Sequence, residues 1–521
     1  MTEIKASCIC AKFFLIFSLF SSASYASPEW KNQHDFDLEK ADLYSVLNRI
    51  TWGVNSSTYK EAKSIGVNQY VDQQLHPGRD ELPIEIQSQI DAMTISQRPV
   101  DQLLIELEQR RKKVDSILKS TVSDNEKKTA QLAYQNELNR LEREAASRSL
   151  LRDVYSRNQL LEHMTWFWMN HFNIFPGKNN LHAMVGDYED KAIRPHSLGK
   201  FRDLLAAAVF HPAMLRYLDN DQNAANHINE NYAREILELH TLGVDAGYTQ
   251  RDVQEFARIL TGVGVNFERG TPTVKRELQN QYVRRGVFEF NPNRHDYGNK
   301  VFFGKVILGQ GLAEVNEVLD ILSRHPATAH FISQKLAAYF IGDNPPAALV
   351  KRMTNTFIQT DGQIDATLAT LFKAPEFRQS LGHVFKDPIH YVVSSIRLAY
   401  DRKPILNTTP MVKWLYRMGE SLYGRQTPDG YALSSIFWFS SGQMMTRFEI
   451  GKAIGSGSAF LFNPEGQQAQ EHSAFPQLAN ALYYEVLQNS LSQTTQQALE
   501  KATSSQEWNT FLLSSPEFMH R

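Results

Sequence analysis

Cysteine is nearly absent from the sequence: its 521 residues include 2 cysteines, Cys8 and Cys10. Both lie in the segment 1–26, ahead of a predicted cleavage site. The mature chain would then carry no thiol, which excludes disulfide bonds, thiolate metal sites and cysteine nucleophiles. Packing alone must therefore stabilise the protein in an oxidising compartment.

The segment 1–26 has the pattern of a secretory signal peptide. Lysines precede the apolar run 13–20, and Ser24 and Ala26 place small residues at the −3 and −1 positions of a cleavage site. The run is too short for an ordinary transmembrane helix, and no later stretch approaches the roughly eighteen uninterrupted apolar residues that such a helix needs. We therefore expect an exported protein, periplasmic or extracellular, with no transmembrane segment after signal cleavage.

An excess of charge of either sign is also missing. The chain has 55 lysine and arginine residues against 57 aspartate and glutamate residues, which gives a formal net charge of −2. Proteins that bind nucleic acids usually concentrate positive charge on one surface. We therefore expect no nucleic acid among the partners.

Signature motifs of common enzyme classes are missing as well. The chain has no His-Glu-x-x-His zinc motif, no Gly-x-Ser-x-Gly nucleophile turn, no phosphate loop ending in Gly-Lys-Ser/Thr and no Gly-x-Gly-x-x-Gly fingerprint. The familiar hydrolase, kinase and dehydrogenase classes therefore lose their main support. The sequence identifies no cofactor, and it leaves open whether a metal is bound.

Helical periodicity dominates what is present, and it predicts a mainly α fold with one multi-helical globular body. The stretch 98–149, rich in Leu, Glu, Lys, Arg and Gln with a polar break at 120–125, predicts two long helices folded into a hairpin arm. Between 265 and 310, glycine, proline and short β-branched or aromatic runs predict a small β-hairpin insertion. The remaining segments are predicted to be helical: an N-terminal segment at 27–97, a central core at 150–264, and two further regions at 311–402 and 403–521.

The most distinctive stretch is 229–243, which reads Asn-Glu-Asn-Tyr-Ala-Arg-Glu-Ile-Leu-Glu-Leu-His-Thr-Leu-Gly. At about 100° per residue, a helix here gathers polar side chains within one arc of roughly 140°. The members of this arc are Glu230, Asn231, Arg234, Glu235 and Glu238. The remaining face is mainly apolar, so it predicts docking on a core. The polar arc is therefore a candidate site.

A polar pocket formed by this helix and by His295–Asp296 is the site that the sequence favours. Glu235 and Glu238 stand three residues apart, a spacing that lets two carboxylates face one ion or one substrate proton. In this interpretation either glutamate is the general base or a ligand, Arg234 clamps an anion, and a histidine supplies the acid or a second ligand. The residues expected to line the ligand-binding part are Asn170, His171, Asn229, Glu230, Asn231, His240 and Lys300. The pair His295–Asp296 equally suits a hydrogen-bonded turn.

Two alternatives for the central residues stay open. Glu230, Arg234 and Glu238 stand at i, i+4 spacing, which also forms the ion-pair ladder that simply stabilises a helix. The loop 219–230 imitates a calcium-binding loop, but Ala224 stands where the sharp turn requires glycine.

Specific pieces of sequence also carry a family resemblance. They are 47–53 with 66–75, 166–172, 211–214 with 218–220, 229–243, 247–262, 290 with 295–296 and 300–309, 325–336, and 427–431. At these pieces the chain resembles a bacterial family of secreted proteins known as domain of unknown function 1800 (DUF1800). The resemblance covers almost the whole mature chain and implies a secreted, mostly helical protein without assigned catalytic residues. Many relatives have a longer, variable loop at 221–228, which argues against a calcium site.

Two functional hypotheses follow. The first is an exported, hydrolase-like enzyme whose polar pocket binds a metal or a polar ligand. The second is a non-enzymatic assembly or maturation partner of a sulfatase-like exported protein, because the resemblance implies that such a protein is often encoded nearby. In that case the arm would supply the contact surface.

Overall fold

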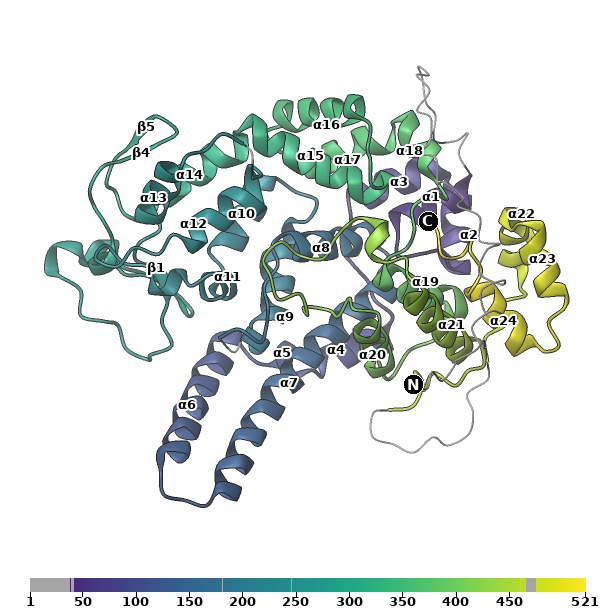
Figure 1. Ribbon diagram of the computed structural model, residues 1–521, viewed down its shortest axis with the longest axis horizontal. Helices are drawn as coiled ribbons and strands as arrows, with labels where there is room; N and C mark the ends of the chain where they lie inside the picture. Colours follow the sequence, from purple (N-terminus) through teal and green to yellow (C-terminus); the bar gives the residue numbers. More distant parts are fainter. Residues whose placement is uncertain (1–37, 39–41, 180, 245, 465–474) are drawn as a thin grey trace, which may run out of the picture.

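The computed structural model describes residues 38, 42–179, 181–244, 246–464 and 475–521. The predicted signal peptide at 1–26 lies outside these residues. The described chain is mainly α-helical, as predicted, and its strands are short (Figure 1). Within the described ranges, no helix is both long enough and apolar enough to span a bilayer.

Short helices lead from the N-terminal region into the arm. They are α1 (Leu43–Ile50), α2 (Ser56–Ile65), α3 (Val67–Leu75), α4 (Ile84–Asp91) and α5 (Thr94–Gln97). Asp42 and Asn55 begin α1 and α2, where their side chains accept hydrogen bonds from backbone N–H groups. Such caps satisfy donors that a helix start otherwise leaves unpaired.

The arm is a hairpin of two long helices, α6 (Val100–Lys119) and α7 (Asp124–Tyr155), and it confirms the predicted helical hairpin. Ser123 and Glu126 form a capping box that starts α7. The turn between the two helices projects away from the body, whereas their other ends join it (Figure 1). The arm is thus anchored at one end.

The central region combines α-helices with two π-helices. The elements are α8 (Gln159–His171), α9 (Val185–Asp187), η3 (π, Tyr188–Ile193), α10 (Phe201–Val209), α11 (Pro212–Tyr217), α12 (Asn231–Glu235), η6 (π, Ile236–Thr241) and α13 (Gln250–Ile259). The 3₁₀ segments that the structure describes within 42–521 include η2 (Leu181–Ala183), η4 (Arg194–His196), η5 (Asn220–Gln222), η7 (Arg276–Gln281), η8 (Pro292–Arg294) and η9 (Ser435–Phe437).

The predicted helix at 229–243 is regular only in its first half. After α12 a π-helix follows, in which the N–H of Leu242 donates to the carbonyl of Leu237 at 2.9 Å, five residues back. The hydroxyl of Thr241 donates to the carbonyl of Ile236 at 2.7 Å and supports this wider turn. The prediction of a regular α-helix is therefore wrong in the second half, where a π-turn replaces the α-helical turn. Glu238, the one arc residue in this half, still lies 3.6 Å from Arg234.

The predicted β-hairpin is present as two small antiparallel sheets. In the first sheet, β3 (Phe288–Phe290) lies between β1 (Val263–Val265) and β2 (Val283–Arg285). In the second, β4 (Lys300–Phe302) pairs with β5 (Lys305–Ile307). The connection between the two sheets carries His295 and Asp296.

Helices make up most of the remaining chain. They are α14 (Leu312–Arg324), α15 (Pro326–Ile341), α16 (Ala347–Gln359), α17 (Ile364–Phe372), α18 (Pro375–Ser380), α19 (Pro388–Tyr400), α20 (Thr409–Arg417), α21 (Ser441–Gly455), the π-helix η10 (Tyr483–Leu487), α22 (Gln488–Ser490), α23 (Gln493–Glu500) and α24 (Ser505–Leu513).

Residues from distant parts of the chain meet in the core. Arg49 of α1 is fully buried and donates to the hydroxyl and the carbonyl of Ser380 at 2.8 and 2.5 Å. It also donates to the carbonyls of Phe340 and Arg521. A guanidinium can serve four acceptors at once because it carries five N–H donors. The first helix and the last residues of the chain therefore pack into one body.

Candidate functional site

The polar face of the central helix is a network of ion pairs. Arg234 lies between Glu230 and Glu238, with nitrogen–oxygen distances of 3.1 and 3.6 Å. Its guanidinium also donates to the side-chain oxygen of Gln250 at 2.8 Å, and the Gln250 amide donates to Glu230 at 2.6 Å. Because these side chains are partly exposed, each pair contributes only about 0.2–1 kcal/mol. These contacts are those of the ion-pair ladder that the i, i+4 spacing also predicted. The role of Arg234 as an anion clamp stays a prediction.

Asn229 and Asn231 hold the loop that precedes this helix. The side chain of Asn231 donates to the carbonyl of Leu218 at 3.2 Å, and that of Asn229 donates to the carbonyl of Asp219 at 3.4 Å. The carboxylate of Asp219 is paired with Lys178 at 2.8 Å. In the described part of the chain, no three His, Cys, Asp or Glu side chains gather so that they could hold a metal ion.

His295 and Lys300 bind one buried carboxylate, that of Glu314. His295 Nε2 lies 2.9 Å from Glu314 Oε1, and Lys300 Nζ lies 2.5 Å from Glu314 Oε2. The other ring nitrogen of His295 faces the carbonyl of Thr261 at 2.8 Å. All three side chains are at most 1% exposed. Both nitrogens of His295 thus face acceptors, which leaves neither of them for a substrate.

Asp296 is tied to the neighbouring helix. Its carboxylate accepts from Arg258 at 2.8 Å and from the N–H of Gly298 at 2.8 Å. Burial raises the pKa of Asp296, but these contacts lower it by more, so the pKa lies below its ordinary value. The contacts of His295, Asp296 and Lys300 attach the β region to α13 and α14. They do not assemble the predicted pocket with the central helix.

Other predicted residues meet a lysine for which the sequence predicted no role. His171, at the end of α8, donates from Nε2 to the carbonyl of His240 at 3.1 Å and accepts at Nδ1 from the amine of Lys335 at 2.9 Å. Lys335 lies on α15, with Nζ 5.4 Å from the ring centroid of Phe331. The two hydrogen bonds assign the ring proton of neutral His171 to Nε2. Residues from α8, η6 and α15 thus converge on one amine.

The surroundings of this amine shift several pKa values. Burial lowers the pKa of Lys335 to about 8. Burial and the nearby Lys335 charge lower the pKa of His171 far below its ordinary value and that of His240 to about 3. Both imidazoles are therefore neutral at pH 7. The pKa of Glu235 moves in the opposite direction, because burial and two neighbouring carboxylates raise it.

Asp429, in the loop 425–431, acts electrostatically on the same lysine. Its negative charge opposes the lowering of the Lys335 pKa and adds to the raised pKa values of Glu235 and Tyr217. The Asp429 carboxylate is itself held within its loop, where it accepts from Arg425 at 2.8 Å and from the hydroxyl of Thr427. Lys335 is half-buried and Asp429 is exposed. Lys335 and His171 thus form a partly accessible amine–imidazole pair, and Asp429 adds negative charge to the surroundings of the amine.

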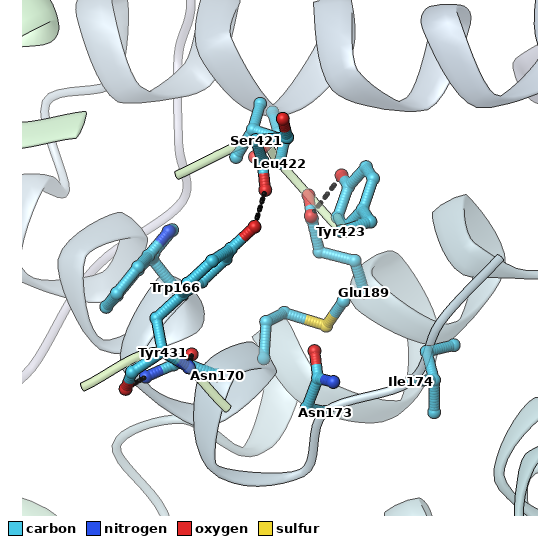
Figure 2. A pocket seen from close by; sticks show the side chains of 11 residues that line it. Trp166, Asn170, Asn173, Ile174, Glu189, Ser421, Leu422, Tyr423 and Tyr431 are labelled. Atoms are coloured by element: carbon cyan, nitrogen blue, oxygen red, sulfur yellow. Dashed lines mark hydrogen bonds between the residues drawn. The ribbon is translucent and has the colours of Figure 1, made fainter. Parts of the chain in front are cut away.

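Asn170 fixes the loop that carries Asp429. Its amide donates to the carbonyl of Tyr431 at 2.9 Å and accepts from the N–H of Tyr431 at 2.6 Å. Figure 2 shows this pair beside Ser421, to whose carbonyl the Tyr431 hydroxyl donates at 3.0 Å. The cavity there has a volume of about 30 Å³, room for little more than a water molecule. The observed contacts of Asn170 position the loop, and its ligand-binding role stays a prediction.

Three residues of this arrangement were not predicted as site residues: Lys335, Asp429 and Asn173, whose amide donates to two carbonyls of the loop 425–431 at 2.9 Å each. Lys335 and Asp429 stand in the stretches 325–336 and 427–431 that carry the family resemblance. That resemblance is the signal that could have found them.

A further chain of polar groups lies deeper in the core. Asp387 Oδ1 lies 2.6 Å from His390 Nδ1, and His390 Nε2 lies 2.5 Å from His163 Nε2. The ring of Trp52 packs on both imidazoles, with centroid distances of 4.8 Å to His163 and 4.5 Å to His390. The order of carboxylate and imidazole is that of a catalytic relay, but both histidines are at most 1% exposed. These hydrogen-bonded side chains therefore stabilise the core, and a substrate cannot reach them.

Comparison with known proteins identifies the family. The family described as "Protein of unknown function (DUF1800)" matches residues 45–520, nearly the whole chain. No curated protein and no solved structure matches it. The family match confirms the resemblance that the motifs carried: the chain belongs to the DUF1800 family.

Proposed function

We propose that the protein is an exported, hydrolase-like enzyme that uses Lys335 and Glu235 for acid–base chemistry on a small polar substrate. The observation that carries the proposal is the contact of Lys335 with the neutral ring of His171 at 2.9 Å, beside the electrostatic effect of Asp429 on the amine. Lysines with a lowered pKa and carboxyls with a raised pKa are typical of catalytic sites. Lys335 thereby joins Glu235, which the sequence had already favoured.

Each group has a distinct role in this proposal. With a pKa of about 8, roughly one tenth of the Lys335 side chains are unprotonated at pH 7 and can accept a proton or attack a carbonyl carbon. Glu235, with its raised pKa, supplies the complementary acid. His171 positions the amine, because its bond to the His240 carbonyl fixes Nδ1 as an acceptor.

Competitive acetylation tests the amine directly. The whole mature protein is acetylated at a series of values from about pH 6 to 11, and the reactivity of each lysine is quantified by mass spectrometry. We expect half-maximal reactivity of Lys335 near pH 8. A midpoint near the ordinary lysine value of about 10.4 would contradict the proposal.

Turnover tests the chemistry, with a panel of chromogenic nitrophenyl esters as the probe. Lys335→Met and Glu235→Gln are each expected to lower turnover about 100-fold or more, the usual contribution of a proton-transferring side chain. Glu230→Gln is the matched control on the same helix, because Glu230 contacts Arg234 and Gln250 instead of the amine. Turnover retained in both site variants, or no turnover by the wild-type protein, counts against the proposal.

A second candidate role is that of an assembly or maturation partner for another exported protein, for which a sulfatase-like protein is the hypothesis. The arm favours it, since it projects from the body (Figure 1) and exposes Leu118, Val122 and Leu132. Replacing residues 108–135 by a short Gly-Ser turn is then expected to abolish co-purification of a partner from the exported fraction. Lys335-dependent turnover should survive the replacement. Unchanged co-purification would exclude the arm as the contact.

A further inference from the structure

A cavity at the base of the arm lies apart from the group around Lys335. It has a volume of about 220 Å³ and lies between the start of α6, the α9–η3 segment, the start of α11 and the turn between β2 and β3. Pockets for drug-sized ligands measure roughly 300–1,000 Å³. This cavity therefore suits a smaller molecule.

One wall of the cavity is a fixed set of side chains. Asp187 Oδ1 lies 2.6 Å from Lys191 Nζ, and Asp187 Oδ2 lies 3.3 Å from His211 Nε2. His211 Nδ1 accepts the backbone N–H of Ala213 at 3.2 Å, so the ring proton that faces Asp187 is on Nε2. Both carboxylate oxygens and both ring nitrogens are thus engaged within the protein. These side chains therefore define the shape of the cavity, and other residues must bind a ligand.

Two charged side chains at the cavity are unpaired. Asp101, in the first turn of α6, and Arg285, at the end of β2, have no side-chain hydrogen bond or ion pair with any residue that the structure describes. The carboxylate of Asp101 lies against Gly286, where an added Cβ would come within 2.3 Å of Oδ1. Gly286 directly follows Arg285, so Asp101, which is partly exposed, and Arg285, which is exposed, line neighbouring parts of the cavity rim. Such a place suits a ligand that carries both charges.

The interior of the cavity is apolar. Leu104, Met184 and Val287 line it and are almost completely buried. An apolar group of a ligand placed against them would gain about 25 cal/mol for each Å² removed from water. The ligand should therefore combine two opposite charges with an apolar substituent.

We propose that this cavity binds a small zwitterion with an apolar substituent, of the chemical class of free apolar amino acids. The ammonium group pairs with Asp101, and the carboxylate receives two parallel hydrogen bonds from the guanidinium of Arg285. The apolar substituent packs on Leu104, Met184 and Val287. This binding is independent of the acid–base chemistry proposed for Lys335.

Calorimetric titration of the whole mature protein with L-leucine tests this inference. We expect saturable binding. Isocaproate lacks the ammonium group and isoamylamine lacks the carboxylate, so each should bind about tenfold more weakly or worse, as expected for the loss of one charged hydrogen-bond partner. Asp101→Asn and Arg285→Gln should weaken L-leucine binding to a similar extent.

The controls separate binding from folding. Arg276→Gln removes an exposed arginine outside the cavity and should leave L-leucine binding unchanged. Because Asp101 and Arg285 lack partners in the protein, their replacement should also leave the urea midpoint unchanged. The inference is overturned if wild-type protein fails to bind L-leucine, or if both variants bind it as tightly as wild type. Neither result bears on Lys335, whose own variants leave this cavity intact.

Discussion

A Glu314→Ala variant is expected to lose about 3–5 kcal/mol of unfolding free energy, the usual cost of leaving a buried charge without its partner. Glu314 binds His295 and Lys300, and it also accepts the N–H groups of Gln310 and Gly311 at 2.7 and 2.9 Å. Removing the carboxylate leaves an ammonium and an imidazole at 0% exposure without a counter-charge. Urea unfolding at neutral pH, followed by circular dichroism, measures the loss.

The same helix provides the control. Glu317, also on α14, pairs with Lys305 at 2.8 Å, but the two side chains are 39% and 58% exposed. Water screens such a pair, so Glu317→Ala should cost less than about 1 kcal/mol. If Glu314→Ala costs no more than Glu317→Ala, the buried network does not hold the β region onto α14.

Local patterns predicted the helical body, the arm and the β region, because each depends on residues close together in the sequence. The polar break at 120–125 is the turn of the arm, and Ser123 with Glu126 supplies the cap that restarts the helix. The central helix shows where such patterns fail. Its spacing predicts a regular α-helix, whereas the observed π-turn also depends on the hydrogen bond from Thr241 to the Ile236 carbonyl.

Partners from distant positions could not be predicted from spacing. The sequence singled out His295 but not Glu314, which stands 19 residues away on a helix where a glutamate resembles any solvated residue. Lys335 and His171 are separated by 164 residues, and a lysine on an amphipathic helix is ordinarily a surface charge. Only tertiary packing brings this amine against His171 and lowers its pKa, so the composition of α15 does not reveal it.

Replacing His240 by phenylalanine is expected to remove a loss of stability at low pH. The rings of His171 and Phe172 lie 5.7 and 5.2 Å from that of His240, so phenylalanine preserves the ring packing. In the folded protein, burial and the charge of Lys335 lower the pKa of His240 to about 3. In the unfolded chain a histidine titrates near about 6.5. Between these values the unfolded state binds a proton that the folded state does not, so this group destabilises the fold as the pH falls.

From about pH 7 to about pH 4, wild-type protein should therefore lose about 3 kcal/mol more unfolding free energy than His240→Phe. The comparison of the two proteins is needed because other buried groups act in the opposite direction: burial raises the pKa of Glu420, which favours the folded state as the pH falls. His383→Phe, at an exposed position, controls for the removal of an imidazole. If the unfolding free energies of wild type and His240→Phe change with pH in parallel, His240 takes up its proton in the folded protein as readily as in the unfolded chain. Burial would then not lower the pKa of His240, and the same argument for the lowered pKa of the adjacent Lys335 would fail. The acid–base proposal would fail with it.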